Sequence, residues 1–280
     1  MDKLAILGPK GTFSDCAAKE FLKECNLKMK KIYFSSIDDA FHSVGNECEY
    51  GIIPIENTLD GFVQRTLDLL LEMDVTILTE IKIPIKFSLM ANVNKISELK
   101  KLYVQFKSSG QCRKFTDTLN GVSIITTESN MESYYKLKAG IEGDGAIVPA
   151  HICDSEISYV DKNVTDADEN YTRFIIIKAN KEFKWREYED KSNIKIPLYI
   201  LPKSDKPGML FEILKGFSDN QINLVSIMSR PTKKQMGTYN FYIEIDTSST
   251  KFEKIKATVM ELNKKYKIKI LGNYQVKNVL

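Results

Sequence analysis

A threonine and an arginine stand at the start of a run of isoleucines. Residues 170–177 read NYTRFIII, so Thr172 and Arg173 directly precede a run that is typical of a buried strand. A hydroxyl at a strand end can donate a hydrogen bond to a ligand. A cation there requires an anionic partner, because an unpaired buried charge is costly. Arg173 therefore either pairs with an acidic side chain of the protein or binds an anionic ligand.

Polar residues also follow two other apolar runs. The loop 8–14, GPKGTFS, opens a helical pattern, but its spacing matches neither of the common phosphate-binding glycine motifs. It is either a glycine turn or a helix start that binds a carboxylate near Thr12 and Ser14. Glu56 and Asn57 end the run YGIIPIEN, where they either cap the next helix or bind a small polar ligand.

Two further polar residues belong to later helical patterns. Gln111 ends the segment SSGQ, which opens a helix after the run LYVQF. Glu128 begins the pattern ESNMES, where capping and ligand binding are again both open. The two histidines do not provide a Ser-His-Asp or Cys-His arrangement.

The elements that position these residues alternate along residues 1–180. Short apolar runs and helical patterns follow one another, which predicts βα units and a mostly parallel sheet. In such a sheet, ligands collect at the carboxyl ends of the strands, where helix N-termini present their amides. The polar residues above are therefore predicted to lie at one edge.

A second unit follows a charged segment. Residues 181–193, KEFKWREYEDKSN, lack apolar periodicity and are predicted to be a linker. Residues 194–280 then show a βαββαβ order, which is ferredoxin-like.

Composition limits the classes of function. The net charge of +3 arises from lysines scattered among acidic residues, which does not favour a nucleic-acid partner. The five cysteines are widely spaced and the chain has two histidines, so we expect no metal site and no disulfide framework. No apolar run is long enough for a signal peptide or a membrane span, which favours a cytoplasmic protein without a membrane partner.

Three segments, in this order, resemble the best-marked motifs of the prephenate dehydratase family: LGPKGTFSDCAAKEF, GIIPIENTLDGFVQRTLDLL and ENYTRF. The segment PGMLFEILKGFSDNQINLVSIMSRP is similar to the two ligand loops of the ACT domain that follows in that family. The resemblance implies an α/β fold with a bilobed catalytic domain, like type 2 periplasmic binding proteins, and a C-terminal ACT domain. The lobes are expected at roughly 1–78 with 167–180, and at 79–166.

The resemblance also implies an activity without a cofactor: prephenate loses carbon dioxide and hydroxide to give phenylpyruvate. The family's catalytic threonine carries over to Thr172, and Glu128 matches an active-site glutamate that is the candidate proton donor. Gln111, Glu56 and Asn57 match substrate-orienting positions. Thr12 and Ser14 of the first motif are also expected to bind substrate, while Arg173 either binds a substrate carboxylate or is structural.

One segment departs from the family pattern. The family's Ser-His-Pro-Gln stretch falls on residues 104–107, VQFK, so Val104 replaces an active-site serine. The sequence does not decide whether this change lowers activity. Thr172, Gln111 and Glu128 are retained, which favours a working enzyme.

In the ACT part, the resemblance implies feedback inhibition by phenylalanine, bound across a subunit interface of a homodimer or homotetramer. The implied effector-binding residues are Pro207, Gly208, Met209, Leu210, Asn223, Leu224, Ser229 and Arg230. Met209 and Met228 replace the usual alanine and glutamate, and either could instead fill gaps in a core.

Two alternatives remain open from the sequence. Arogenate dehydratase differs only in the amino group of its substrate, and the residues do not separate the two. A non-catalytic amino-acid-sensing or solute-binding module is also compatible with a bilobed fold that has lost a serine. Because no helical extension precedes the first strand, a fused chorismate mutase is not expected.

Overall fold

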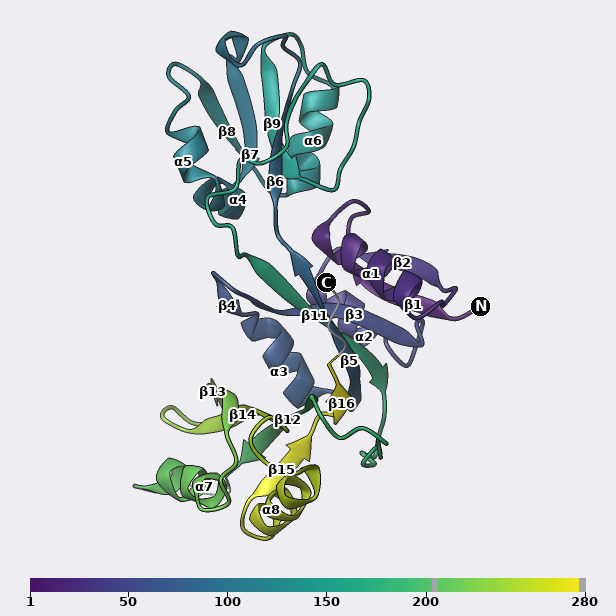
Figure 1. The fold of residues 1–280 in the computed structure, drawn as a ribbon, viewed down its shortest axis with the longest axis vertical. Coiled ribbons are helices and arrows are strands. Elements are labelled where there is room, and N and C mark those ends of the chain that lie inside the picture. The colour runs from purple at the N-terminus through teal and green to yellow at the C-terminus, as the bar shows by residue number, and fades with distance from the viewer. Residues whose placement is uncertain (203–205, 277–280) are drawn as a thin grey trace.

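The computed structural model describes residues 1–202 and 206–276 and contains three β-sheets, which Figure 1 shows stacked along the long axis. The first sheet has the order β2-β1-β3-β11-β5, with β4 paired to β3. Its strands are β1 (Lys3–Leu7), β2 (Lys30–Phe34), β3 (Tyr50–Asn57), β4 (Gly61–Phe62), β5 (Val75–Pro84) and β11 (Tyr171–Ala179). With the helices α1 (Phe13–Glu24), α2 (Ile37–His42) and α3 (Gln64–Glu72), it forms the first lobe.

The second sheet, in the order β10-β6-β9-β7-β8, forms the second lobe at the top of Figure 1. Its strands are β6 (Phe87–Ala91), β7 (Lys101–Gln105), β8 (Ser123–Thr127), β9 (Asp144–Pro149) and β10 (Tyr159–Asp161). Its helices are η1 (Ile96–Glu98), α4 (Phe106–Gln111), α5 (Arg113–Thr116) and α6 (Asn130–Lys138). The chain enters this lobe after β5 and returns to the first lobe at β11, so two segments connect the lobes.

The prediction of one mostly parallel sheet is wrong. The pairs of β1 with β2 and β3, and of β7 with β8 and β9, are parallel. However, β11 is antiparallel to both β3 and β5, and β6 is antiparallel to β9 and β10. The physical reason is the lobe crossing: β11 re-enters the first sheet from the second lobe and therefore runs against its neighbours.

The third sheet belongs to the C-terminal unit, which the structure describes over residues 194–202 and 206–276. The sheet order is β13-β14-β12-β15, with β16 (Tyr274–Gln275) paired to β12. Its elements follow the predicted order: β12 (Ile194–Leu201), α7 (Met209–Ser218), β13 (Leu224–Pro231), β14 (Tyr239–Asp246), α8 (Phe252–Lys265) and β15 (Lys267–Ile270). The βαββαβ prediction is thus confirmed, although residues 203–205 and 277–280 lie outside the described part.

One hydrophobic core joins the first lobe to the C-terminal unit. Ile53, Leu67 and Ile177 of the first lobe share a buried cluster with Tyr199 and Tyr242 of the C-terminal unit. The clusters of the second lobe, in contrast, contain buried residues of that lobe and of its entry and exit segments. The segment between Ala179 and Ile194 forms neither helix nor strand, and its Trp185 packs on the C-terminal core.

Candidate active site

A cavity of about 400 Å³ lies where the two lobes meet. The second lobe contributes Phe87, Gln105, Lys107, Ser108, Gln111 and Asn130 to its lining, and the connecting segment contributes Ile85. The first lobe contributes Phe13, Asn57, Asp60, Gly61, Phe62, Val63, Gln64 and Thr172. A volume of this size fits a small-molecule ligand.

Thr172 is held at this cavity by a chain of amides. β11 and β3 pair so that Thr172 lies opposite Asn57, and Asn57 Nδ2 donates to Thr172 Oγ1 over 3.0 Å. The same amide donates to Asn170 Oδ1 over 2.9 Å, and Asn170 Nδ2 donates to Gln111 Oε1 of the second lobe over 3.0 Å. Because Thr172 Oγ1 accepts from Asn57, its own hydrogen is available for donation into the cavity.

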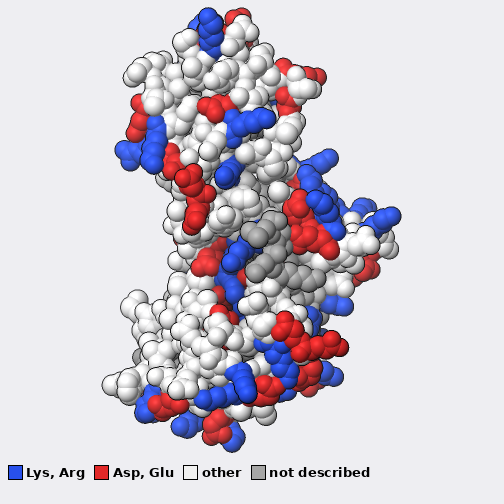
Figure 2. Space-filling view, in the orientation of Figure 1, with Lys and Arg blue, Asp and Glu red and all other residues white. Residues whose placement is uncertain are grey.

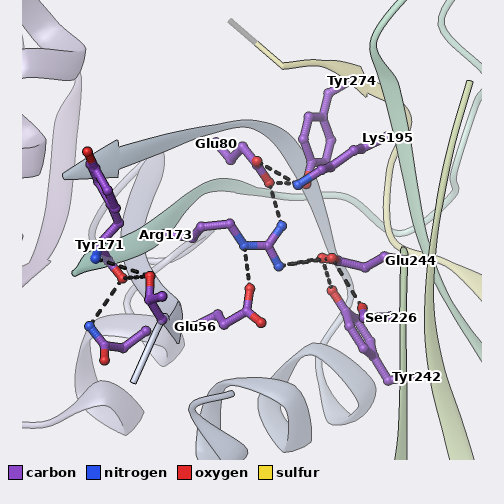
Figure 3. A network of polar contacts seen from close by, with 11 residues as sticks. Glu56, Glu80, Tyr171, Arg173, Lys195, Ser226, Tyr242, Glu244 and Tyr274 are labelled. Atoms are coloured by element: carbon purple, nitrogen blue, oxygen red, sulfur yellow. Dashed lines mark hydrogen bonds and ion pairs between the residues drawn. The ribbon is translucent and has the colours of Figure 1, made fainter. Parts of the chain in front are cut away.

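Arg173 and Glu56 lie on the other face of the same strands, because successive strand residues point to opposite faces. Figure 3 shows Arg173 among three carboxylates. Its Nη1 is 3.0 Å from Glu80 Oε2, and its Nη2 is 2.9 Å from each carboxylate oxygen of Glu244. Its Nε is 2.9 Å from Glu56 Oε2. Neither Arg173 nor Glu56 lines the cavity, so the structural alternative for Arg173 describes its position here.

The charges in this cluster shift one another's titration. Burial alone would raise the pKa of Glu244, but the charges of Arg173 and Lys195 outweigh it and hold the pKa below its usual range. Burial would lower the pKa of Arg173, but Glu244 and Glu80 raise it. Arg173 and Glu244 therefore both stay ionised in the folded protein at neutral pH.

Glu128 is not brought to the cavity in this structure. It precedes α6 and is exposed, and its backbone N–H donates to Glu132 Oε2 over 2.7 Å. Ser129 caps the helix instead, accepting a hydrogen bond from Glu132 N. The residue of this segment that lines the cavity is Asn130, which accepts a hydrogen bond from Ser108 Oγ.

Thr12 and Ser14 also stay outside the cavity lining. Thr12 caps α1, where its Oγ1 accepts from Asp15 N and donates to Pro9 O over 3.0 Å, while Ser14 is buried. Phe13, between them, does line the cavity, and its ring lies edge-on to Phe87 of the second lobe at a centroid distance of 5.5 Å. The first motif thus provides a helix cap and a contact between the lobes.

Sequence reasoning missed the roles of several residues at or beside the cavity. Asn170, which links Asn57 to Gln111, is buried. It belongs to the NYTRF segment, and its place next to Thr172 in that segment was the sequence feature that could have indicated its role. Lys107 lies across from Asp60, with 3.8 Å between Nζ and Oδ2. Val104, in the place of the family's serine, is fully buried in the core of the second lobe and does not line the cavity.

The predicted effector-binding residues lie in different places in the C-terminal unit. Asn223 and Leu224 line a surface cavity of about 450 Å³ beside α7. Gly208 is the N-cap residue of α7 and has a φ of 82°, which a glycine adopts readily; it follows the exposed Pro207. The side chain of Arg230 points to the first lobe, where its Nε is 2.9 Å from Asp68 Oδ1.

The other predicted effector-binding residues differ in exposure. Leu210 and Ser229 are exposed, whereas Met209 is buried in the C-terminal core. Met228 is partly buried and packs on the core shared with the first lobe. Both methionines therefore fill gaps between packed elements.

Metal-binding and membrane-spanning features are absent from the part of the chain that the structure describes. Over residues 1–202 and 206–276, no group of three or more His, Cys, Asp or Glu side chains could hold a metal ion. Within the same ranges, no helix has both the length and the apolar character needed to cross a membrane. On the face in Figure 2, basic and acidic side chains are intermixed.

Comparison with known proteins gives matches over nearly the whole chain. The family model described as prephenate dehydratase matches residues 4–182, and that of the ACT domain matches residues 203–261. A prephenate dehydratase of Methanocaldococcus jannaschii is 36% identical over 273 residues, covering 96% of each chain.

Solved structures of similar proteins share the fold. The crystal structure of prephenate dehydratase from Staphylococcus aureus has a TM-score of 0.79 and 27% identity, covering 98% of this chain and 100% of that one. A structure of prephenate dehydratase from Arthrobacter aurescens in complex with L-Phe has a TM-score of 0.83 at 24% identity, covering 99% of this chain and 92% of that one. The bilobed α/β fold with a C-terminal ACT domain is therefore confirmed.

Proposed function

The chain belongs to the prephenate dehydratase family, and we propose that it converts prephenate to phenylpyruvate, with release of carbon dioxide and water. The observation that carries the proposal is the hydroxyl of Thr172 in the cavity between the lobes, held by Asn57 and connected through Asn170 to Gln111. Residues 1–180 are the proposed catalytic domain, 181–193 the linker and 194–280 the regulatory domain.

In this mechanism Thr172 donates a hydrogen bond to the hydroxyl oxygen that leaves the ring. The carboxylate carbon departs as carbon dioxide, and the electron pair of the broken carbon–carbon bond enters the ring as the carbon–oxygen bond breaks. Aromatisation drives the step, so the protein must orient the substrate and stabilise the departing oxygen. Because an aliphatic hydroxyl is a weak acid, Thr172 acts by hydrogen bonding, and a separate group supplies the proton.

Glu128 is the proposed proton donor in a closed form of the cleft. In this structure it is exposed, so the role requires the second lobe to move toward the first. Closure would bring its carboxyl within reach of the departing hydroxyl oxygen, which is the geometry that a general acid needs.

The cavity also suits a dianionic substrate. Lys107 is the cation among its lining residues, and Gln111 and Asn57 supply amide groups. We assign Lys107 to one substrate carboxylate and Gln111 to orientation of the ring. Glu56 and Arg173 then support the strand ends from the opposite face, as their ion pair indicates.

Regulation by phenylalanine is proposed for the C-terminal unit. β13 is an edge strand of its sheet, and its exposed side includes Val225 and Ile227. Leu210 and Phe211 of α7 are also exposed apolar residues. An unpaired edge with apolar side chains favours association with a second copy, which supports a homodimer or homotetramer with the effector between copies. The proposed location is the cytoplasm.

The test is phenylpyruvate formation by the purified chain, with prephenate and arogenate in parallel reactions. We expect turnover of prephenate, a loss of about 100-fold or more in Thr172→Ala, and retention of most activity in Thr172→Ser, which keeps the hydroxyl. If the chain turned over arogenate and not prephenate, its substrate would be arogenate.

The non-catalytic alternative makes a different prediction for the same chain. A sensing module would bind the ligand without turnover, and Thr172→Ala would leave that binding unchanged. Calorimetric titration with prephenate separates this outcome from an inactive enzyme preparation. Activity of Thr172→Ala equal to that of the wild type would remove the proposed role of this residue.

A further inference from the structure

The strand that presents Thr172 is anchored from the C-terminal unit. Arg173, the next residue, is buried, and both carboxylate oxygens of Glu244 in β14 lie 2.9 Å from its Nη2. Figure 3 shows this contact crossing from β11 to the C-terminal unit. Glu244 is itself buried and also accepts hydrogen bonds from Tyr242 and Ser226, so its carboxylate has a fixed position.

The wall between the cavity and the C-terminal unit is thin at this point. Phe62 lines the cavity, and its ring centroid is 5.9 Å from the Arg173 guanidinium carbon. The Tyr242 ring of β14 lies against the same Phe62 at a centroid distance of 5.6 Å. Tyr242 and Glu244, two positions apart on β14, thus contact the cavity-lining Phe62 and Arg173, the residue next to Thr172, respectively.

The backbone beside Arg173 is irregular. The pairing of β11 with β3 shifts register between Arg173 and Phe174, where Arg173 lies opposite Glu56 and Phe174 opposite Pro54. Such a bulge redirects side chains and interrupts the ladder of hydrogen bonds. The direction of Thr172 therefore depends more on side-chain anchors here than in a regular strand.

Glu244 is the carboxylate whose charge can be removed without leaving a cation of this cluster unpaired. Three carboxylates, Glu56, Glu80 and Glu244, surround the two cations Arg173 and Lys195. Neutralising Glu244 leaves two carboxylates for two cations, so no cation becomes unpaired. The Nε–H of Arg173 has no aligned hydrogen-bond acceptor among the described residues, and Glu56 meets it as an ion pair only. Glu56 is thus a poor substitute for Glu244, whose two carboxylate oxygens both lie 2.9 Å from Arg173 Nη2.

We propose that Arg173 is a positioning residue, through which Glu244 of the C-terminal unit fixes the strand end that presents Thr172 to the cavity. This inference rests on the proposed function for its kinetic consequence. The positioning itself is a property of the fold.

The test compares Glu244→Gln with Tyr199→Phe in the full chain. Both remove a buried interaction between the same two parts of the molecule, but Tyr199 Oη donates to Leu67 O on α3 and does not touch Arg173. For Glu244→Gln we expect kcat to fall about tenfold with KM within about twofold, because misplacement of a catalytic group lowers turnover. For Tyr199→Phe, both constants should stay within about twofold of the wild type.

Hydrogen exchange provides a readout that does not need turnover. The peptide covering residues 170–174 should exchange faster in Glu244→Gln than in the wild type, and at the wild-type rate in Tyr199→Phe. Unchanged exchange in Glu244→Gln, or equal losses in both variants, would overturn the inference. A wild-type chain inactive on prephenate but with faster exchange in Glu244→Gln would instead refute the proposed function and leave the positioning role supported.

Discussion

The first lobe has two boundaries, and they are built differently. Toward the second lobe, the first lobe makes individual contacts: the ion pair of Lys107 with Asp60, the hydrogen bonds of His151 with Gly11 and of Asn170 with Gln111, and the edge contact of Phe13 with Phe87. Toward the C-terminal unit, the first lobe shares a hydrophobic core and buries the Arg173 ion pairs. Lys269 of β15 adds a polar contact there, because it donates to Leu71 O and Met73 O at the end of α3.

The difference indicates which parts move together. A boundary of isolated, partly exposed contacts opens and closes at low cost, whereas a shared core with buried charges does not. We therefore expect the first lobe and the C-terminal unit to act as one body and the second lobe to move against it. We expect a change in the C-terminal unit to reach the cavity through β11, whose first residues include the lining residue Thr172.

The largest loss in the free energy of unfolding is expected from Arg173→Ala, at the boundary between the first lobe and the C-terminal unit. The substitution leaves Glu56, Glu80 and Glu244 facing one another with Lys195 as the remaining cation. Removal of one partner from a buried ion network costs about 3–5 kcal/mol. Urea denaturation should show this loss in the free energy of unfolding.

Arg113→Ala is the matched control, because Arg113 is exposed on α5 and its side chain pairs with Asp117 over 3.7 Å. A surface substitution of this kind should change the free energy of unfolding by less than about 0.5 kcal/mol. If Arg173→Ala were as stable as Arg113→Ala, the ion network would not be part of what holds the two units together.

A second prediction concerns acid. The pKa of Glu244 is depressed in the folded protein, so its contribution to stability is fully present above the unfolded glutamate pKa of about 4.3. It is lost as the pH falls through the lower, folded pKa. Between the unfolded and the folded pKa, the wild type should therefore lose stability more steeply than Glu244→Gln as the pH falls. Urea midpoints at pH 7 and at decreasing acid pH measure the slopes, and parallel curves would contradict the assignment.

Much of the site could be predicted because its signals are local. Thr172, Asn57 and Gln111 each lie near the start or at the end of an element with a clear pattern, and the structure joins them through Asn170. The partner of Arg173 could not be predicted, because Glu244 lies in another unit and no feature of the sequence around Glu244 indicates the pairing. The antiparallel direction of β11 was missed for a similar reason, since it depends on how the chain crosses between lobes.

Lys107→Gln should weaken substrate binding at the mobile boundary without affecting stability. The Lys107 side chain is 69% exposed and 3.8 Å from Asp60, so the ion pair contributes little to folding. Loss of one solvated charge contact to a carboxylate costs about 1 kcal/mol, which corresponds to a rise of about fivefold in KM. Lys114→Gln, on the same lobe but outside the cavity lining, should leave KM unchanged. Equal KM values for both variants would exclude Lys107 from substrate binding.

The smallest change in the free energy of unfolding is expected from His151→Ala. Comparing this variant with Tyr199→Phe compares the two boundaries of the first lobe directly. Each wild-type side chain donates one hydrogen bond to a backbone carbonyl across a boundary: His151 Nε2 to Gly11 O over 2.9 Å, and Tyr199 Oη to Leu67 O over 2.8 Å. His151 is exposed, so water replaces its bond and the free energy of unfolding should change by less than about 0.5 kcal/mol. The buried Tyr199 hydroxyl should contribute about 1 kcal/mol, since water cannot take its place. Thermal denaturation of both variants measures the contrast, and a larger loss in His151→Ala would mean that the boundary between the lobes is the more rigid one.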